Sequence, residues 1–564
     1  MKACAGLPLV VAALFCSTGE ATTSLLNKPF DPHENMHLQH DAPKLVKLKK
    51  GFDLPKLDVA AFDPHVNLET IEKKYEKMGI MFDDVAPLKP RVFAKAIVDH
   101  FAKKKSAHWE QRYYLNDEYW GGPGFPVFLM IGYVILVAFV HDHRACLCRG
   151  EAPIQPSDVS HEMFYMNTLA IEHKALLVSL EHRFYGESYP APDMSVDSLA
   201  LLSIPQALAD VVVFHAHLTK KHGLGASKWV AFGGSYPGNL AVWLKAEYPD
   251  LVVGAIASSA PIQLVADFQE YMAVVSDSIT RVGGAECGHA IEAAMQALDD
   301  AIVDVLAHPT KKKKKKTKGL GGHTLYDVMP VCEPLTNEMD AMVLESIVKG
   351  QFQGIVQYND FDPINIKATC KYFKSVEAEK PLVQLAGYMS MASPGYCLMS
   401  TFSGTAASML NQTAFAGIEF DGKSTERQWT YQRCTELGAT QSGGPPLDTI
   451  FKPLQFTTFK YSGKKVCEGL FGKGHNFNNL DAINEWLGGN RPATQNVTFL
   501  NGNVDPWYPM GLLDKANLHD ESNTVVVIDG TAHCRDMYAP QVNDTKAIQN
   551  AQRIVAENVQ LYLS

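Results

Sequence analysis

Two patterns of apolar and polar residues alternate along residues 89–266. Short apolar runs at 128–132, 175–180 and 229–232 have the length of buried strands, and longer stretches with helical spacing lie between them. Strands that alternate with helices in this way favour a mostly parallel sheet whose two faces are both covered. This part of the chain therefore predicts an α/β fold.

The pattern changes over residues 267–487, where helical stretches such as 290–306 and 340–348 dominate. Residues 488–564 then return to alternating strand and helix patterns. A long helical segment between two stretches of alternating strands and helices predicts one domain built on a sheet, with a helical domain inserted into it. The length of 564 residues agrees with two domains, because it exceeds what one simple core usually holds.

A sharp break follows the apolar run at 229–232. Gly233 and Gly234 precede Ser235 there, and an apolar helix pattern resumes immediately afterwards. This is the layout of a nucleophile elbow, in which a tight strand-to-helix turn exposes the serine hydroxyl. Pro237 takes the place of the usual later glycine, and proline is tolerated in the first turn of a helix. Taken alone, the motif fits a glycine-rich loop about as well as it fits catalysis.

Two later strand patterns end in the residues that such a nucleophile requires. Residues 497–502 lead to Asp505, and the β-branched residues 524–528 lead to His533. The chain order serine, aspartate, histidine is that of an α/β-hydrolase. We therefore predict a triad in which His533 takes the proton of Ser235 and Asp505 orients the imidazole.

These motifs resemble the family of prolyl carboxypeptidase, dipeptidyl peptidase II and thymus-specific serine peptidase. The matches are long, specific and spread over most of residues 109–538. They lie at residues 111–114, 121–123, 127–132, 181–188, 206–210, 233–236, 257–261, 429–436, 501–507 and 530–534. Pro237 and the pair His533-Cys534 look closer to the thymus-specific branch than to the other two.

The resemblance implies an α/β-hydrolase with a mainly helical cap domain, and short peptide substrates cut after proline. Trp507 would then offer a flat wall to the proline ring, although a tryptophan packed in the core explains it equally well. The expected segments are a signal peptide at 1–22, an N-terminal extension or propeptide at 23–88, the first part of the hydrolase core at 89–266, the cap at 267–487 and the last part of the core at 488–564.

The chain departs from the family pattern at residues 133–149. The family runs directly from the strand that ends at Gly132 into the segment that begins at Gly150, whereas this chain has extra residues there. We interpret them as a retained intron, with a genuine surface insertion as the alternative. Their apolar part is too short to cross a membrane. The position matters because one oxyanion donor should be the backbone N–H of Tyr236, and the resemblance places the second around Gly150.

Charge and leader composition indicate partners and compartment. A net charge of −10 argues against nucleic acid as a partner, and we expect the lysine run at 311–318 to be a solvated loop. Residues 1–22 have the charged start, apolar body and small-residue end of a secretory signal, so we expect a secreted or lysosomal protein. The sequence leaves a homodimer open.

Candidate ligands and modification sites are few. The sequence has no CxxC or HExxH pattern that supports a metal, so we expect no metal and no cofactor. Glu181 and His182 follow a strand, and we expect their segment to tie loops together by hydrogen bonds. Secretion favours disulfide bonds, and their pairing cannot be read from the sequence. The candidate cysteines are Cys287, Cys332, Cys370, Cys397, Cys434, Cys467 and Cys534. Because their number is odd, one thiol should stay free, and we expect it to be Cys534. N-glycosylation sequons begin at Asn411, Asn543 and Asn496, the last of which opens a core strand.

The leading hypothesis is a serine exopeptidase that cleaves short peptides, either as a carboxypeptidase or as a dipeptidyl peptidase. An esterase or lipase of the same fold is the first alternative, since the triad serves both chemistries. The second is a secreted binding protein without catalysis, whose oxyanion loop is broken by residues 133–149.

Overall fold

The structure is a computed structural model. It describes residues 88–131, 153–160, 163–308, 324–360, 365–375, 380–392, 397–412 and 425–564, together with the backbone of residues 137–138 and 145–146; Ser408 is described by its backbone alone.

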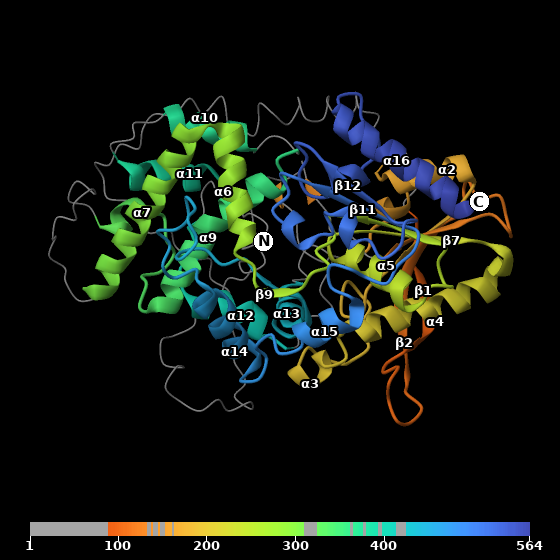
Figure 1. The fold of residues 1–564 in the computed structure, drawn as a ribbon. Coiled ribbons are helices and arrows are strands. Elements are labelled where there is room, and N and C mark those ends of the chain that lie inside the picture. The colour runs from red at the N-terminus through yellow and green to blue at the C-terminus, as the bar shows by residue number, and fades with distance from the viewer. Residues whose placement is uncertain are drawn as a thin grey trace.

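An 8-stranded sheet forms the centre of the fold (Figure 1). Its strands, in spatial order, are β1 (Arg91–Ile97), β2 (His108–Asn116), β6 (Leu176–Leu180), β3 (Val127–Ile131), β7 (Trp229–Gly234), β8 (Gly254–Ser258), β11 (Val497–Gly502) and β12 (Thr524–Ile528). Strand β2 pairs antiparallel with β1 and β6, and the other neighbours pair in parallel. The expectation of a mostly parallel sheet is confirmed.

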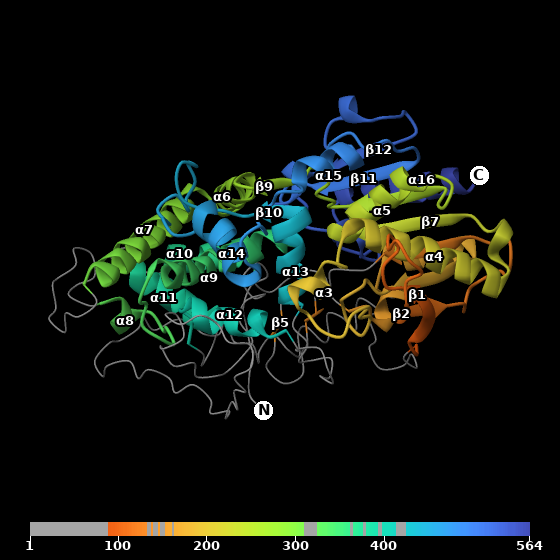
Figure 2. The same ribbon diagram turned by 90° about the horizontal axis from the view of Figure 1, so that it is seen from below.

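Helices cover both faces of this sheet. Helices α2 (Tyr165–His173) and α16 (Lys546–Leu563) lie on one face, and α4 (Ile204–His222) and α5 (Tyr236–Glu247) lie on the other (Figures 1 and 2). Every residue of the central strands β3, β6, β7, β8 and β11 is buried. Burial on both faces explains why these strands read as continuous apolar runs in the sequence.

A mainly helical cap is inserted between β8 and β11. Its helices are α6 (Glu270–Gly283), α7 (Ala285–Ala307), α8 (Leu325–Val328), α9 (Glu338–Gln357), α10 (Ile366–Ser375), α11 (Pro381–Ala392), α12 (Phe402–Leu410), α13 (Glu426–Gln432), α14 (Val466–Phe471) and α15 (Leu480–Leu487). Helix α9 runs through the middle of the cap and is buried along almost its whole length. The short parallel strands β9 (Val265–Asp267) and β10 (Gly438–Thr440) pair beside the cap. The helices expected at 290–306 and 340–348 are confirmed.

Three disulfides tie the cap together. They join Cys287 to Cys370, Cys332 to Cys397 and Cys434 to Cys467. The first links α7 to α10, so it holds two neighbouring cap helices covalently. Cys534 is buried and free, which confirms the expectation that it is the odd thiol.

The segment that follows β6 acts as scaffold. The buried Glu181 carboxylate accepts hydrogen bonds from the Arg112 guanidinium at 2.5 Å and from the Ser188 hydroxyl at 2.7 Å. The fully buried Arg183 donates two hydrogen bonds of 2.7 Å to Asp210. These bonds connect β2, the loop after β6 and α4, and they confirm the structural interpretation of this segment.

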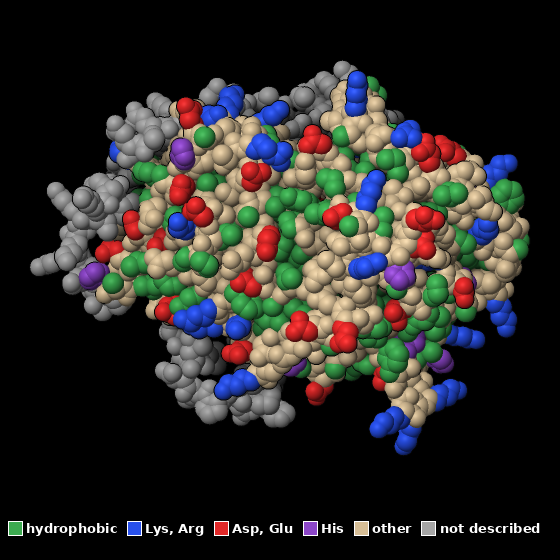
Figure 3. All heavy atoms as spheres, viewed as in Figure 1, with side chains coloured by type: hydrophobic (Ala, Val, Ile, Leu, Met, Phe, Trp, Pro, Cys, Tyr) green, Lys and Arg blue, Asp and Glu red, His purple; other side chains and the backbone are tan. Residues whose placement is uncertain are grey.

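Several sequence expectations fall on residues outside the described part. They are the signal segment and extension at 1–87, the lysine run at 311–318 and most of the extra residues 133–149. Within the last of these, the backbones of β4 (Val137–Ala138) and β5 (Ala145–Cys146) pair antiparallel. Among the described residues, none of the helices has the length and apolarity to cross a bilayer. Acidic and basic side chains are interspersed over the face shown in Figure 3.

Candidate active site

Ser235 lies at the turn between β7 and α5 in an unusual backbone conformation. Its φ is 62° and its ψ is −132°, a region that residues with a side chain rarely occupy. The backbone N–H of Ser235 donates to the carbonyl oxygen of Ser258 at 2.9 Å, and its own carbonyl oxygen accepts from Asn239 at 3.1 Å. These two bonds fix the strained residue, as in a nucleophile elbow.

The two glycines before Ser235 are closely packed. A Cβ atom on Gly233 would lie 2.1 Å from the carbonyl oxygen of Pro237, in the first turn of α5. A Cβ atom on Gly234 would lie 2.2 Å from the sulfur of Met537 and 2.9 Å from that of Cys534. A side chain at Gly233 would therefore overlap the backbone of α5, so glycine is required there, whereas a side chain at Gly234 would have to displace the side chains of Met537 and Cys534.

Asp505 and His533 form a buried pair. The Nδ1 atom of His533 lies 2.7 Å from Oδ2 of Asp505, and the side chains are 1% and 0% exposed. A carboxylate only accepts hydrogen bonds, so Nδ1 carries a proton, and Nε2 is an acceptor only when the ring is neutral, which requires a pH above the pKa of the imidazole. Burial alone would lower the pKa of the imidazole, but the charge of Asp505 and its hydrogen bond raise the pKa of His533 well above its usual value.

The Nε2 atom of His533 is buried and has no hydrogen-bond partner among the described residues. Ser235 and His533 are both held at the carboxyl end of β8. Ser258 binds the backbone of Ser235, and the hydroxyl of its neighbour Ser259 accepts a 2.9 Å bond from the N–H of Cys534. No hydrogen bond joins Nε2 of His533 to the hydroxyl of the half-buried Ser235 in the described part of the chain, so the structure brings Asp505 and His533 together but does not close the contact to Ser235. A neutral imidazole whose Nε2 has no other partner can accept a proton from a nucleophile that comes within hydrogen-bond distance.

Tyr236, the residue whose N–H is expected to be an oxyanion donor, is the first residue of α5. Its phenol oxygen lies 3.2 Å from Nε2 of His182 and accepts a 3.1 Å hydrogen bond from Gln432 of the cap. Burial lowers the pKa of His182 to about 4, so this ring is neutral at physiological pH. The other expected donor, Gly150, lies outside the described residues.

Trp507 is half-buried beside the Asp505–His533 pair. Its ring centroid is 6.4 Å from that of His533, and its backbone N–H donates to Oδ1 of Asp505 at 2.9 Å. Phe268 and Tyr271 pack against it at centroid distances of 5.9 and 5.3 Å. One part of the Trp507 side chain therefore packs against core residues, and the ring also lies near the imidazole of His533.

Sequence reasoning missed Gln357, the last residue of α9. Its backbone carbonyl oxygen accepts a 3.0 Å hydrogen bond from the N–H of His533, and its amide oxygen accepts one of 3.0 Å from the indole of Trp507. A signal was present in the sequence. Polar residues recur every four positions in an otherwise mostly apolar helix, at Glu345, Lys349, Gln353 and Gln357.

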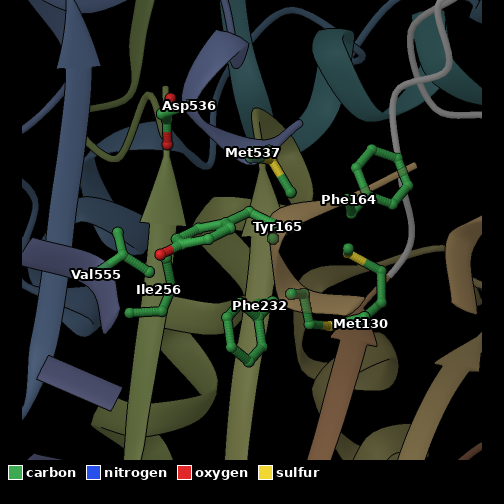
Figure 4. A pocket seen from close by; sticks show the side chains of 10 residues that line it. Met130, Phe164, Tyr165, Phe232, Ile256, Asp536, Met537 and Val555 are labelled. Atoms are coloured by element: carbon green, nitrogen blue, oxygen red, sulfur yellow. The ribbon is translucent and has the colours of Figure 1, made fainter. Parts of the chain in front are cut away.

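A cavity of about 20 Å³ lies under the elbow on the face covered by α2 and α16 (Figure 4). Phe232 and Ile256 line it from β7 and β8, and Asp536 and Met537 line it from the loop after β12. A space of this size holds about one water molecule. We therefore assign it to packing beneath the turn and not to substrate.

The three sequon asparagines differ in their surroundings. Asn411 and Asn543 are exposed. Asn496 is half-buried, and its amide nitrogen, the atom that would carry a glycan, donates a 3.1 Å hydrogen bond to the carbonyl oxygen of Val253. A glycan at Asn496 would replace one of the two hydrogens on this half-buried nitrogen and would have to fit beside the backbone of Val253, so the exposed Asn411 and Asn543 are the better candidates.

The sheet order, the serine at a strand-to-helix turn and the helical cap define an α/β-hydrolase fold. Comparison with known protein families shows which kind of α/β-hydrolase this chain is. The model of the serine carboxypeptidase S28 family matches residues 96–555, and the chain belongs to this family. The prediction of a serine-type peptidase is thereby confirmed.

Curated relatives are similar over most of the chain. A Caenorhabditis elegans protein named as a serine protease, K12H4.7, is 32% identical over 82% of this chain and 85% of its own length. Human thymus-specific serine protease is 28% identical over 87% and 90% of the two chains. Bovine lysosomal Pro-X carboxypeptidase is 27% identical over 83% and 86%. The family resemblance inferred from the motifs is confirmed.

Proposed function

We propose that this peptidase removes residues from an end of short peptides, cutting after proline through an acyl-enzyme on Ser235. The observation that carries the proposal is the buried hydrogen bond between Asp505 and His533, which leaves Nε2 of the imidazole without a partner among the described residues. Backbone contacts tie both loops to the end of β8: the N–H of Ser235 donates to the carbonyl oxygen of Ser258, and the N–H of Cys534, next to His533, donates to the hydroxyl of Ser259. The proposal requires the hydroxyl of Ser235 to approach Nε2 when substrate binds.

In the proposed mechanism, His533 accepts the hydroxyl proton while Oγ of Ser235 forms a bond to the peptide carbonyl carbon. The resulting imidazolium is stabilised by the Asp505 carboxylate. His533 then gives the proton to the leaving amine as the C–N bond breaks, and water hydrolyses the ester that remains. The N–H of Tyr236 and a second donor around Gly150 would bind the oxyanion.

The proposed preference for proline rests on Trp507 and on a relative. The indole lies beside the imidazole and is half-buried, so part of its surface is available to a flat pyrrolidine ring. The relative named lysosomal Pro-X carboxypeptidase supports the same substrate class.

A peptide panel tests the reaction. Peptides with proline or alanine next to the C-terminal residue, and at the second position from the N-terminus, would be incubated with the protein and analysed by mass spectrometry. We expect cleavage after proline at one end of the chain and at a much lower rate after alanine. Hydrolysis of p-nitrophenyl esters without peptide cleavage would favour an esterase. Absence of both reactions in folded protein would favour a binding protein without catalysis.

We also infer that the protein enters the secretory pathway and is secreted or lysosomal. Three disulfides in the cap fit an oxidising compartment, and the sequons at Asn411 and Asn543 are exposed. Treatment of the expressed protein with an N-glycosidase should increase its electrophoretic mobility. A protein that carries no glycan and stays in the cytosol would contradict this inference.

A further inference from the structure

The side chain of Gln357 binds three aromatic residues at once. Its amide oxygen accepts hydrogen bonds from the hydroxyl of Tyr271 at 2.6 Å and from the indole N–H of Trp507 at 3.0 Å. Its amide nitrogen donates to the hydroxyl of Tyr358, whose ring meets that of His533 edge-on at a centroid distance of 6.2 Å. Gln357 is 5% exposed.

The orientation of this amide is set by its partners. An indole N–H can only donate, so the amide atom that faces Trp507 must be the oxygen. Both acceptor positions of that oxygen are used, by Trp507 and Tyr271. These hydrogen bonds therefore fix the side-chain amide of Gln357 in one orientation. The amide in turn fixes the position of the Trp507 indole.

The segment around Gln357 also binds the loop that carries the imidazole, through one backbone group and one side chain. The carbonyl oxygen of Gln357 accepts from the N–H of His533 at 3.0 Å, and Oδ2 of Asp360 accepts from the N–H of Ala532 at 2.6 Å. One short cap segment thus contacts the loops of both Asp505 and His533.

The other polar residues of the same helix face bind groups within the cap. Glu345 accepts from the N–H of Phe456, Lys349 donates to the carbonyl oxygen of Gln441, and Gln353 donates to the amide oxygen of Gln441 at 3.2 Å. Gln353 is as buried as Gln357 and lies one turn before it in α9. It is therefore a matched control of the same residue type.

We propose that Gln357 is a positioning residue for substrate recognition, which acts from the cap by fixing the indole of Trp507 at the angle that receives the proline ring. This inference rests on the proposed function. Loss of the amide leaves the hydroxyl of Tyr271 and the N–H of Trp507 as buried donors without an acceptor, so the two rings would turn to find other partners. The backbone bond to His533 would persist, because it does not involve the side chain.

Gln357→Met tests the proposal, since methionine has a similar volume and no amide. For a proline-containing peptide we expect KM to rise about 10-fold, as for the loss of one specific polar contact, with kcat changed by less than about 3-fold. The rate of labelling by a small fluorophosphonate, which does not need the indole wall, should stay within about 3-fold of the wild type. Gln357→Glu keeps an acceptor oxygen and should restore most of the binding.

Trp507→Phe removes the indole N–H and keeps an aromatic ring, so it should also raise KM. Combining it with Gln357→Met should add little, because both changes break the same bond. Gln353→Met should leave KM within about 2-fold. The assays would use the full chain, and also the chain that joins Gly132 to Gly150.

A hydrolysing wild type whose KM is unchanged by Gln357→Met overturns the inference and leaves the proposed function intact. An equal rise of KM in Gln353→Met also overturns it, because the effect would then be general to the cap. If Gln357→Met does not fold, Trp507→Phe decides, and an unchanged KM in that variant overturns the inference. A folded wild type that hydrolyses no peptide in either form overturns the proposed function, and the inference falls with it.

Discussion

The imidazole of His533 and the carboxylate of Asp505 share a 2.7 Å hydrogen bond in a site that excludes solvent from both side chains. The two residues follow the last two strands of the sheet, β12 and β11, which pair in parallel. Parallel pairing brings the carboxyl ends of both strands to the same edge, so residues far apart in the chain meet there.

Asp505→Asn should keep the fold and lower kcat by about 10³- to 10⁴-fold, because the amide favours the wrong imidazole tautomer. The carboxylate raises the pKa of His533, so its removal should lower that pKa and move the acidic limb of kcat/KM to lower pH. Profiles of kcat and of kcat/KM against pH measure the two effects. Asp250→Asn, at an exposed carboxylate, is the control. An unchanged profile in Asp505→Asn would remove Asp505 from the proposed triad.

Gly234→Ala tests the packing of the elbow. The new Cβ atom would overlap the sulfur atoms of Met537 and Cys534, so we expect a loss of about 1–3 kcal/mol in the free energy of unfolding, together with reduced turnover. Gly225→Ala is the matched control, since a Cβ atom there would meet no atom within 4 Å. Urea unfolding of the two variants measures the difference. If both variants had the same free energy of unfolding, the side chains of Met537 and Cys534 would be able to move away from the new Cβ atom without loss of stability, and our interpretation of Gly234 would be wrong.

Asp360→Asn tests the contact between cap and core as a function of pH. Burial raises the pKa of Asp360 to about 6. At a pH between the unfolded and the folded pKa, the carboxyl group therefore keeps its proton in the folded protein and has lost it in the unfolded chain. The stability from this group is present below the unfolded pKa and is lost as pH rises through about 6. Relative to the wild type, Asp360→Asn should therefore gain about 1 kcal/mol between pH 5 and pH 7.5. Urea unfolding at the two pH values checks this, and a constant difference would contradict it.

The sheet and the order of its motifs could be predicted from the sequence because they rest on local patterns. Ser235, Asp505 and His533 each follow an apolar strand, and a short stretch of sequence shows this. Gln357 could not be assigned in the same way. Its partners Tyr271 and Trp507 lie in distant parts of the chain, and only packing of the cap on the core brings them together. The pairing of the cap cysteines could not be predicted either, because it also depends on contacts between distant parts of the chain.

The extra residues 133–149 provide a further prediction. They interrupt the turn that should present the second oxyanion donor, and losing one donor costs about 10² to 10³ in turnover. We expect the full chain to be poorly secreted or nearly inactive, and a chain that joins Gly132 directly to Gly150 to be secreted and active. Specific activity at equal folded concentration, at acidic and neutral pH, compares the two. Equal activity would mean that Gly150 has to be abandoned as the donor.

The most direct test of the account is to locate the nucleophile. Both forms of the chain would be treated with a fluorophosphonate, digested and mapped by mass spectrometry, beside Ser235→Ala, His533→Ala and Asp505→Asn. We predict one adduct, on Ser235, that is absent in Ser235→Ala and formed far more slowly in the other two, with double variants little worse than single ones. An adduct on another residue, or a Ser235→Ala variant that keeps more than a few per cent of peptide turnover, would contradict the account.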